Sequence, residues 1–300
     1  MKKTKKSLVL AMTASILCMS LASCDTKTNS NVSYDDYGIA SDLMGAELMG
    51  KLHDKLMNEH TTYITYGSVN SYRKQTDADP NKSGNYILFY TGKSVSSGGT
   101  REHVWACANS NGLWTHTESD GSHYVDKSSY KGGGSDLYHI RPCGSEINTL
   151  RGNAKFLEFT SEDKEGSDYY VCTETGGKYS LKCDATDSYA KKVEPADEYK
   201  GDIVRILMYI YIHYSSFLGD NSNLDDVKKD YLGDLRLRDV FGSSYSLTEI
   251  YKLMIKWNEL DPVDELELNR NNAVQEIQGN RNPFVDHPEY MARCFDLEEE

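Results

Sequence analysis

The sequence has little positive charge. Its 33 lysines and arginines stand against 46 aspartates and glutamates, so the formal net charge at pH 7 is −13. Residues 1–23 contain four lysines and no acid, which leaves the rest of the chain near −17. This balance excludes binding of nucleic acid through overall charge alone. A polyanionic partner would have to be held by a local basic patch or by a metal ion.

Long apolar runs are also absent after residue 23. The apolar run at residues 7–21 is shorter than the roughly 20 residues that span a bilayer. It follows "MKKTKK" and precedes "LASC", which is the layout of a signal peptide. "LASC" also resembles the lipobox of bacterial lipoproteins. We therefore predict a signal peptide over residues 1–23 and lipid on Cys24, which would hold the protein on the outer face of a bacterial membrane. Ordinary secretion with cleavage nearby is the alternative.

Two common metal-binding signatures are missing from the sequence. No CxxC pair occurs, which argues against a structural zinc site, and no HExxH occurs, which argues against a metalloprotease. Five cysteines follow Cys24. Cys172 and Cys183 flank a Gly-Gly pair that suits a hairpin turn, so we predict a disulfide between them, with Cys107–Cys143 as a second candidate pair.

The polar segment at residues 24–44 reads as a flexible tether. Residues 45–295 are long enough for one domain with a substantial core, and 22 tyrosines argue against disorder. Residues 296–300 form an acidic tail. No repeat of fixed period is visible.

Helical patterns dominate this domain, most clearly toward its C-terminal end. Asp202 is a candidate N-cap, Ser246 and Glu249 form a capping box, and Gly279 is a candidate helix end. A short aromatic run at residues 85–92 predicts a strand. Helices are expected over 41–60, 200–214 and 246–257, from 145 onward, and between Asp261-Pro262 and Gly279. The predicted class is α+β.

One acid–histidine pair stands out among the polar residues. Glu102-His103 follows a Gly-rich loop and precedes two further polar segments, "DLYHIRP" and "INTLRGN". An isolated pair of this kind usually has no function. The second segment offers Asn148, Arg151 and Asn153, and an amide oxygen from it together with the Glu102 carboxylate would be a donor set that suits Mg²⁺. His103, left without a metal, could act as a base.

The motifs "YILFYTG…REHVW", "SDLYHIRP", "INTLRGNAKF", "KGDIVRILMYIYIHY" and "WNELDPVDELELNRNNAVQEIQGNRNPFVDHPEY" occur in an order that resembles the bacterial endonuclease I family. The resemblance covers about residues 45–291. The family consists of secreted or periplasmic nucleases. It implies a mainly helical domain around a small ββα-metal (His-Me) finger.

The resemblance also implies roles for single residues. Glu102 and Asn153 correspond to the metal ligands, and His103 corresponds to the general base that activates water. The expected cofactor is Mg²⁺, with Mn²⁺ or Ca²⁺ as alternatives. The expected activity is a largely non-specific cleavage of DNA or RNA, or both, that leaves 5′-phosphate ends. No protein partner is implied.

Arginine suits phosphate recognition through its rigid fork of donors, and Arg141, Arg151 and Arg281 are candidates for contacts with the substrate. The sequence departs from the family at Ala106, usually a proline, and at Tyr138, often a histidine. A catalytically weakened surface lipoprotein that binds nucleic acid or a protein partner is therefore the alternative function. His139 is expected to be structural, and Arg205 to pair with an acid.

Overall fold

The computed structural model describes residues 33–109, 113, 128–184, 190–229 and 231–297. The chain divides into two units, Met1–Ser41 and Asp42–Glu300. In the first, Tyr34 and Ala40 form an antiparallel bridge. The predicted signal peptide and Cys24 lie outside the described residues, as does the end of the acidic tail. None of the helices in the described part of the chain has the length and apolar character that a bilayer crossing requires.

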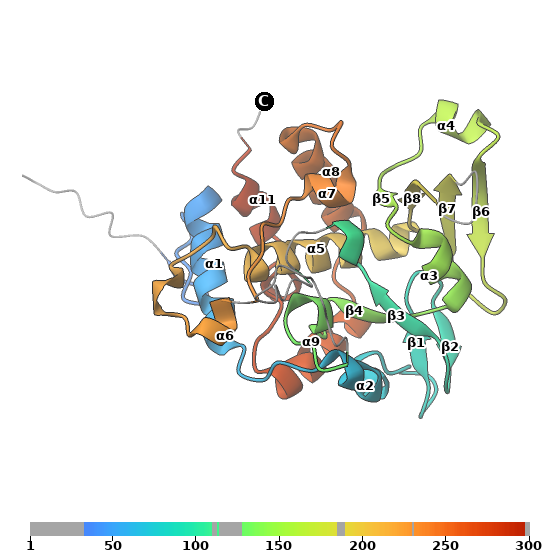
Figure 1. Cartoon of the computed structure of the whole chain (residues 1–300). Coiled ribbons are helices and arrows are strands. Elements are labelled where there is room, and N and C mark those ends of the chain that lie inside the picture. Colours follow the sequence, from blue (N-terminus) through green and yellow to red (C-terminus); the bar gives the residue numbers. More distant parts are fainter. Residues whose placement is uncertain (1–32, 110–112, 114–127, 185–189, 230, 298–300) are drawn as a thin grey trace, which may run out of the picture. The chain divides into compact units, whose positions relative to one another are not determined.

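The second unit mixes helices with small sheets, in agreement with the predicted α+β class (Figure 1). Its central helix is α5, which is almost entirely buried and packs against α1 and α8. The helices are α1 (Gly45–Glu59), α2 (Val69–Thr76), α3 (Ser145–Arg151), α4 (Ser161–Glu165), α5 (Lys200–Tyr214), α6 (Asp226–Lys229), α7 (Arg238–Phe241), α8 (Leu247–Leu260), α9 (Glu265–Gln278), α10 (Pro283–Asp286) and α11 (Tyr290–Phe295).

Two helix ends follow the local sequence signals. At the start of α8, the Ser246 hydroxyl accepts from the Glu249 N–H at 3.2 Å, and the Glu249 carboxylate accepts from the Ser246 N–H at 2.7 Å. This is the predicted capping box. Gly279 follows α9 with φ of 96°, a conformation that favours glycine, so the predicted end of this helix is also confirmed.

Two predicted helix starts were wrong. Asp202 is not the N-cap of α5, because it lies within the first turn, and Asp261-Pro262 precedes α9 rather than opening it. The N-cap of α9 is Asp264. The Asp261 carboxylate instead accepts from the Gly201 N–H at 2.9 Å, so a residue 60 positions away satisfies the N-terminus of α5.

The strands form three separate sheets. β1 (Tyr86–Leu88) pairs with β2 (Lys93–Val95), and β3 (Thr100–His103) pairs with β4 (Ile140–Cys143), both antiparallel. The third sheet has the order β5-β8-β7-β6, with β5 parallel to β8 and the other pairs antiparallel. Its strands are β5 (Lys155–Phe156), β6 (Tyr169–Thr173), β7 (Ser180–Asp184) and β8 (Lys192–Glu194).

The segment β3–β4–α3 has the order of a ββα unit. α3 begins two residues after β4 and packs against β3. The Asn148 side-chain amide on α3 donates to the Thr100 hydroxyl at 2.7 Å and to the Arg101 carbonyl at 3.0 Å, which ties the helix to the strand. This pair of strands and its helix carry the Glu102-His103 pair.

The hairpin expected around Cys172 and Cys183 is β6–β7. Cys172 lies opposite Leu181, two residues before Cys183, so the two cysteines share one face of the hairpin. The structure has both as thiols, and the Cys183 thiol donates to the Leu181 carbonyl. The disulfide between them stays a prediction.

Candidate active site

Glu102 and His103 are the last two residues of β3. Successive side chains of a strand point to opposite faces, so the two leave the strand in different directions. Glu102 points inward and is only 1% exposed, whereas His103 keeps part of its surface in solvent. The pair therefore joins a buried carboxylate to a partly exposed histidine whose ring Nε2 is itself buried.

The Glu102 carboxylate is held from two sides. Its Oε1 accepts from the Tyr90 hydroxyl at 2.6 Å and lies 3.4 Å from the Arg151 Nε. Burial raises the pKa of this carboxyl above its usual value, although the Arg151 charge and the Tyr90 hydrogen bond oppose that shift. Among the described residues only Oε1 is hydrogen-bonded, so Oε2 has capacity for a further partner.

The His103 ring lies between two other rings. Tyr66 stacks on it with centroids 5.5 Å apart, and His139 meets it edge-on at 5.6 Å. Burial of the ring holds its pKa well below the usual 6.5, and the charges of His139, Arg151 and Arg101 lower it further. His103 is therefore neutral at pH 7, the state that a general base requires.

Arg151 fastens α3 to the end of β3. Its guanidinium is fully buried and donates to the His103 carbonyl at 3.2 Å and to the Val104 carbonyl at 2.6 Å. It also lies over the Phe156 ring at 4.7 Å. These contacts fix the backbone on both sides of the His103–Val104 peptide.

Asn153 lies two residues beyond the end of α3 and is exposed. The intervening Gly152 has φ of 49°, which a turn of this kind favours in glycine. The Asn153 carbonyl accepts from the Asn109 side-chain amide at 3.0 Å, and Asn109 ends the short 3-10 turn that follows β3. The loop that carries Asn153 is thus tied to the segment that follows Glu102 and His103.

The structure brings together Glu102, His103 and Arg151, and it ties the Asn153 loop to the chain that follows them. Arg141 and Arg281 have other surroundings. Arg141 is buried, 2.9 Å from the Asp77 carboxylate, and Arg281 pairs with Asp286 at 2.6 Å. A phosphate contact for any of the three arginines stays a prediction.

Sequence reasoning missed three residues around this site: Tyr66, Tyr90 and Asn109. Tyr90 has φ of 67°, a conformation that is rare outside glycine, and it follows β1 in a run that reads as continuous strand. Its aromatic, strand-like neighbours give no sign of this turn. Only the folded chain directs its hydroxyl to Glu102.

The two positions that depart from the family pattern serve the core. Tyr138 is buried, and its hydroxyl lies within hydrogen-bonding distance of the Asn271 and Asn280 carbonyls, at 3.1 and 3.0 Å. Ala106 is buried, and its carbonyl accepts from the Asn109 N–H at 2.8 Å. Neither side chain contacts Glu102 or His103 in the described contacts.

His139 and Arg205 are structural, as expected. His139 Nε2 accepts from the Trp105 N–H at 2.9 Å, and Nδ1 donates to the Gly133 carbonyl at 2.8 Å. Burial lowers its pKa to about 4. Arg205 pairs with both carboxylate oxygens of Glu267, at 2.8 and 2.7 Å.

A second group of possible metal ligands lies in the core. His60, Asp136 and His213 place one nitrogen or oxygen each within 4.8 Å of one another. The Asp136 Oδ2 lies 3.8 Å from His60 Nδ1 and 3.9 Å from His213 Nδ1, farther apart than the roughly 3.4 Å between ligands of a tetrahedral zinc ion. That oxygen already accepts from the Tyr209 and Tyr214 hydroxyls at 2.8 and 2.7 Å. We therefore treat this group as part of the polar core.

A family model described as Endonuclease I matches residues 44–289. The chain belongs to the endonuclease I family. This membership makes it a nuclease that acts on nucleic acids, and it confirms the resemblance read from the motifs.

Similar proteins agree with that membership. The chain is 35% identical to the extracellular ribonuclease of Bacillus subtilis (strain 168) over 256 residues, which cover 82% of this chain and 73% of that protein. It is also 35% identical to the extracellular ribonuclease of Bacillus amyloliquefaciens, over 85% of this chain and 75% of that protein. The Endonuclease-1 of Buchnera aphidicola subsp. Baizongia pistaciae (strain Bp) is 26% identical over 61% of this chain and 60% of its own length.

Proposed function

We propose that this endonuclease I family member is a secreted, metal-dependent and largely non-specific endonuclease. It hydrolyses phosphodiester bonds of DNA, RNA or both and leaves 5′-phosphate ends. The observation that carries the proposal is the attachment of α3 to the end of β3 by Arg151, which contacts the backbone of His103 while its Nε lies 3.4 Å from Glu102. The β3–β4–α3 unit would then be the metal finger of the family.

The donor set suits a hard divalent cation. The Glu102 carboxylate and the Asn153 amide oxygen are the oxygen ligands that Mg²⁺ prefers, and Mn²⁺ or Ca²⁺ would use the same atoms. Glu102 fits this role because its Oε2 has no hydrogen-bond partner among the described residues. A bound cation would neutralise charge on a non-bridging oxygen and on the departing 3′ oxygen.

His103 would take a proton from the attacking water. Its low pKa keeps the imidazole neutral at pH 7, the state in which a ring nitrogen can accept a proton. Because water is the nucleophile, the ribose 2′-hydroxyl is not required. DNA and RNA can then both be substrates, which agrees with relatives named as ribonucleases and as an endonuclease.

The acidic balance of the chain requires local contacts to the phosphates. Arg141, Arg151 and Arg281 are the arginines suggested by the motifs, and each would act from within an existing ion pair or set of hydrogen bonds. Binding should be weak and strongly dependent on salt, because phosphate contacts release counterions.

We place the protein outside the cytoplasm, held to a membrane surface by lipid on Cys24. The signal-peptide pattern, the "LASC" sequence and the extracellular relatives support this location. Scavenging of external nucleic acid for nucleotides is the use that fits it. Metabolic labelling with a fatty-acid analogue, compared with Cys24→Ala, would test the lipid.

Cleavage of plasmid DNA and total RNA tests the activity. We expect purified protein to cut with Mg²⁺ and to stop with EDTA, and we expect His103→Ala and Asn153→Ala to remain folded but lose activity. His287→Ala and Asn58→Ala remove the same side-chain types elsewhere and should cut normally. Activity that is independent of metal, or equal in His103→Ala, contradicts the assignment.

The alternative is a catalytically weakened protein that binds nucleic acid or a protein partner. Its support is the pair of departures at Ala106 and Tyr138, which the structure assigns to core contacts. Such a protein would shift nucleic acid on a gel and leave it intact under every metal tested.

A further inference from the structure

Arg73 and Arg101, both half-buried, differ from the arginines that are buried in ion pairs. Arg141, Arg205 and Arg270 each lie within salt-bridge distance of a carboxylate. Arg73 and Arg101 have no carboxylate partner among the residues that the structure describes. Their hydrogen bonds go to uncharged groups only, so their positive charges are not compensated locally.

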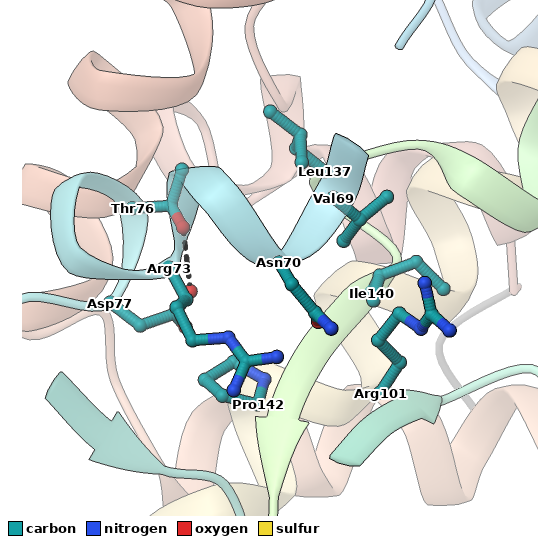
Figure 2. Close-up of a pocket in the computed structure, with 9 residues that line it drawn as sticks. All are labelled: Val69, Asn70, Arg73, Thr76, Asp77, Arg101, Leu137, Ile140 and Pro142. Atoms are coloured by element: carbon teal, nitrogen blue, oxygen red, sulfur yellow. Dashed lines mark hydrogen bonds between the residues drawn. The ribbon is translucent and has the colours of Figure 1, made fainter. Parts of the chain in front are cut away.

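Both arginines line the same small pocket, between α2 and the β3–β4 pair (Figure 2). Arg73 comes from α2 and Arg101 from β3, and the exposed Asn70 lies between them. Asp77 also lines the pocket, but its carboxylate is buried and accepts from Arg141 at 2.9 Å and from Arg270 at 3.1 Å. The negative charge of Asp77 is therefore already paired and does not oppose the binding of an anion in the pocket.

The two guanidinium groups are fixed but not saturated. Arg101 donates through Nη1 to the Tyr66 carbonyl at 2.8 Å and lies over the Tyr66 ring at 3.8 Å. Arg73 donates through Nη1 to the Tyr86 hydroxyl at 3.1 Å and to the Gly98 carbonyl. Each retains further N–H donors, and a guanidinium that is already oriented loses little freedom when it binds phosphate.

The pocket adjoins the proposed base. Arg101 and His103 are two residues apart on one strand, so they share a face and their Cα atoms are about 6.6 Å apart. Tyr66 contacts both, because its ring stacks on His103 and carries the Arg101 guanidinium. This separation is comparable with that between successive phosphates of one nucleic-acid strand.

We propose that Arg73 and Arg101, with the Asn70 amide between them, bind the phosphate next to the scissile one. This subsite rests on the proposed nuclease function and names the part of the substrate that it holds. It supplies the local positive charge that a chain of net charge −13 needs in order to bind a polyanion. Its ligand is a phosphodiester of a strand that continues past the cleaved bond.

The test compares Arg73→Gln with Arg236→Gln on two substrates. Arg236 is exposed and lies two residues before α7, outside the pocket, and Figure 1 shows α7 well apart from α2, so the control removes the same charge elsewhere. One substrate is a single-stranded oligonucleotide, and the other is a dinucleotide with a single phosphodiester bond. Steady-state kinetics are measured with Mg²⁺ at several salt concentrations, after melting curves have established that each variant is folded.

We expect Arg73→Gln to raise KM for the oligonucleotide about tenfold, since charged hydrogen bonds to phosphate are lost. The slope of log KM against log salt should fall by about 0.7, the value for one phosphate contact on a single strand. Dinucleotide cleavage should not change, because that substrate has no neighbouring phosphate. Arg73→Lys should recover part of the affinity, and Arg101→Gln should also raise KM for the oligonucleotide.

Unchanged KM and salt slope in Arg73→Gln, or an equal loss on both substrates, would overturn the subsite. The second result would mean that Arg73 acts only through its bonds to Tyr86 and Gly98. Failure of the nuclease proposal looks different, because the unmodified protein would then cut neither substrate with any metal.

Discussion

Glu102 and Asp136 are both buried carboxylates that accept from tyrosine hydroxyls and lie near histidines, yet their remaining capacity differs. Asp136 Oδ2 accepts from Tyr209 and Tyr214, and its Oδ1 accepts from the Tyr138 N–H at 2.7 Å and the Gln278 amide at 3.2 Å. Glu102 has one described hydrogen bond and one oxygen to spare. A carboxylate with both oxygens satisfied stabilises the core, whereas one with an unused oxygen beside His103 is suited to hold a cation.

The largest expected difference between the surroundings of Glu102 and those of Asp136 is in catalysis. His103→Ala should lower kcat by about 10²- to 10⁴-fold, the usual contribution of a general base, with the melting temperature nearly unchanged. His213→Asn, beside Asp136, should lower the melting temperature while the folded fraction keeps its kcat. The comparison fails if His213→Asn abolishes turnover in protein that remains folded.

The second largest difference between the Glu102 site and the Asp136 cluster should be in metal binding. Mg²⁺ should raise the melting temperature of the unmodified protein, because a ligand that binds only the native state stabilises it. Asn153→Ala should remove most of this rise and weaken the apparent metal affinity at least about tenfold. Asp136→Asn should start from a lower melting temperature and show the full rise. A rise that survives in Asn153→Ala but disappears in Asp136→Asn would move the metal to the core cluster.

For the free energy of unfolding the order should be reversed, so that substitution of Asp136 costs more than substitution of Glu102. Asp136→Asn replaces an acceptor of four hydrogen bonds and should lower the free energy of unfolding by about 3 kcal/mol, since buried partners lose their acceptor. Glu102→Gln keeps an acceptor for the Tyr90 hydroxyl and should cost about 1 kcal/mol. Urea denaturation measures both, and a larger loss for Glu102→Gln would contradict the contrast.

The smallest effect should appear as a pH slope. In the folded protein His139 stays neutral down to about pH 4, whereas the unfolded chain protonates it near pH 6.5. As pH falls from 6.5 to about 4, the unfolded state binds the additional proton, so His139 lowers stability by about 1.4 kcal/mol per pH unit. Above pH 6.5 both states are neutral and the contribution is zero. Denaturation of His139→Gln should lack this part of the slope, and an identical slope in both proteins would refute it.

Much of the fold was predictable where a signal is local. The Ser246–Glu249 capping box and the end of α9 at Gly279 depend on residues within one turn of each other. The start of α5 was not predictable in this way, because its cap is Asp261, which reaches it only in the folded chain. Asp202 has the right residue type but lies three positions beyond Tyr199, the N-cap position of α5.

The candidate active site also combines residues that the sequence predicted with surroundings that only the structure revealed. Glu102, His103 and Asn153 came from motifs that resemble the family, and the structure ties their segments together. The environment that gives the Glu102 carboxylate its burial, and the His103 ring its low pKa, comes from Tyr90, Tyr66, His139 and Arg151. Arg151 was predicted to contact the substrate, and none of the four was predicted to act on the pair.

The sequence by itself determined the acidic balance, the helices with local caps, the α+β class and the motifs of the endonuclease I family, because these depend on composition and on neighbouring residues. The tertiary structure alone decided which arginines are neutralised by acids and which remain charged beside His103. Ion pairing and burial join residues that are distant in the chain, and no short-range pattern specifies them.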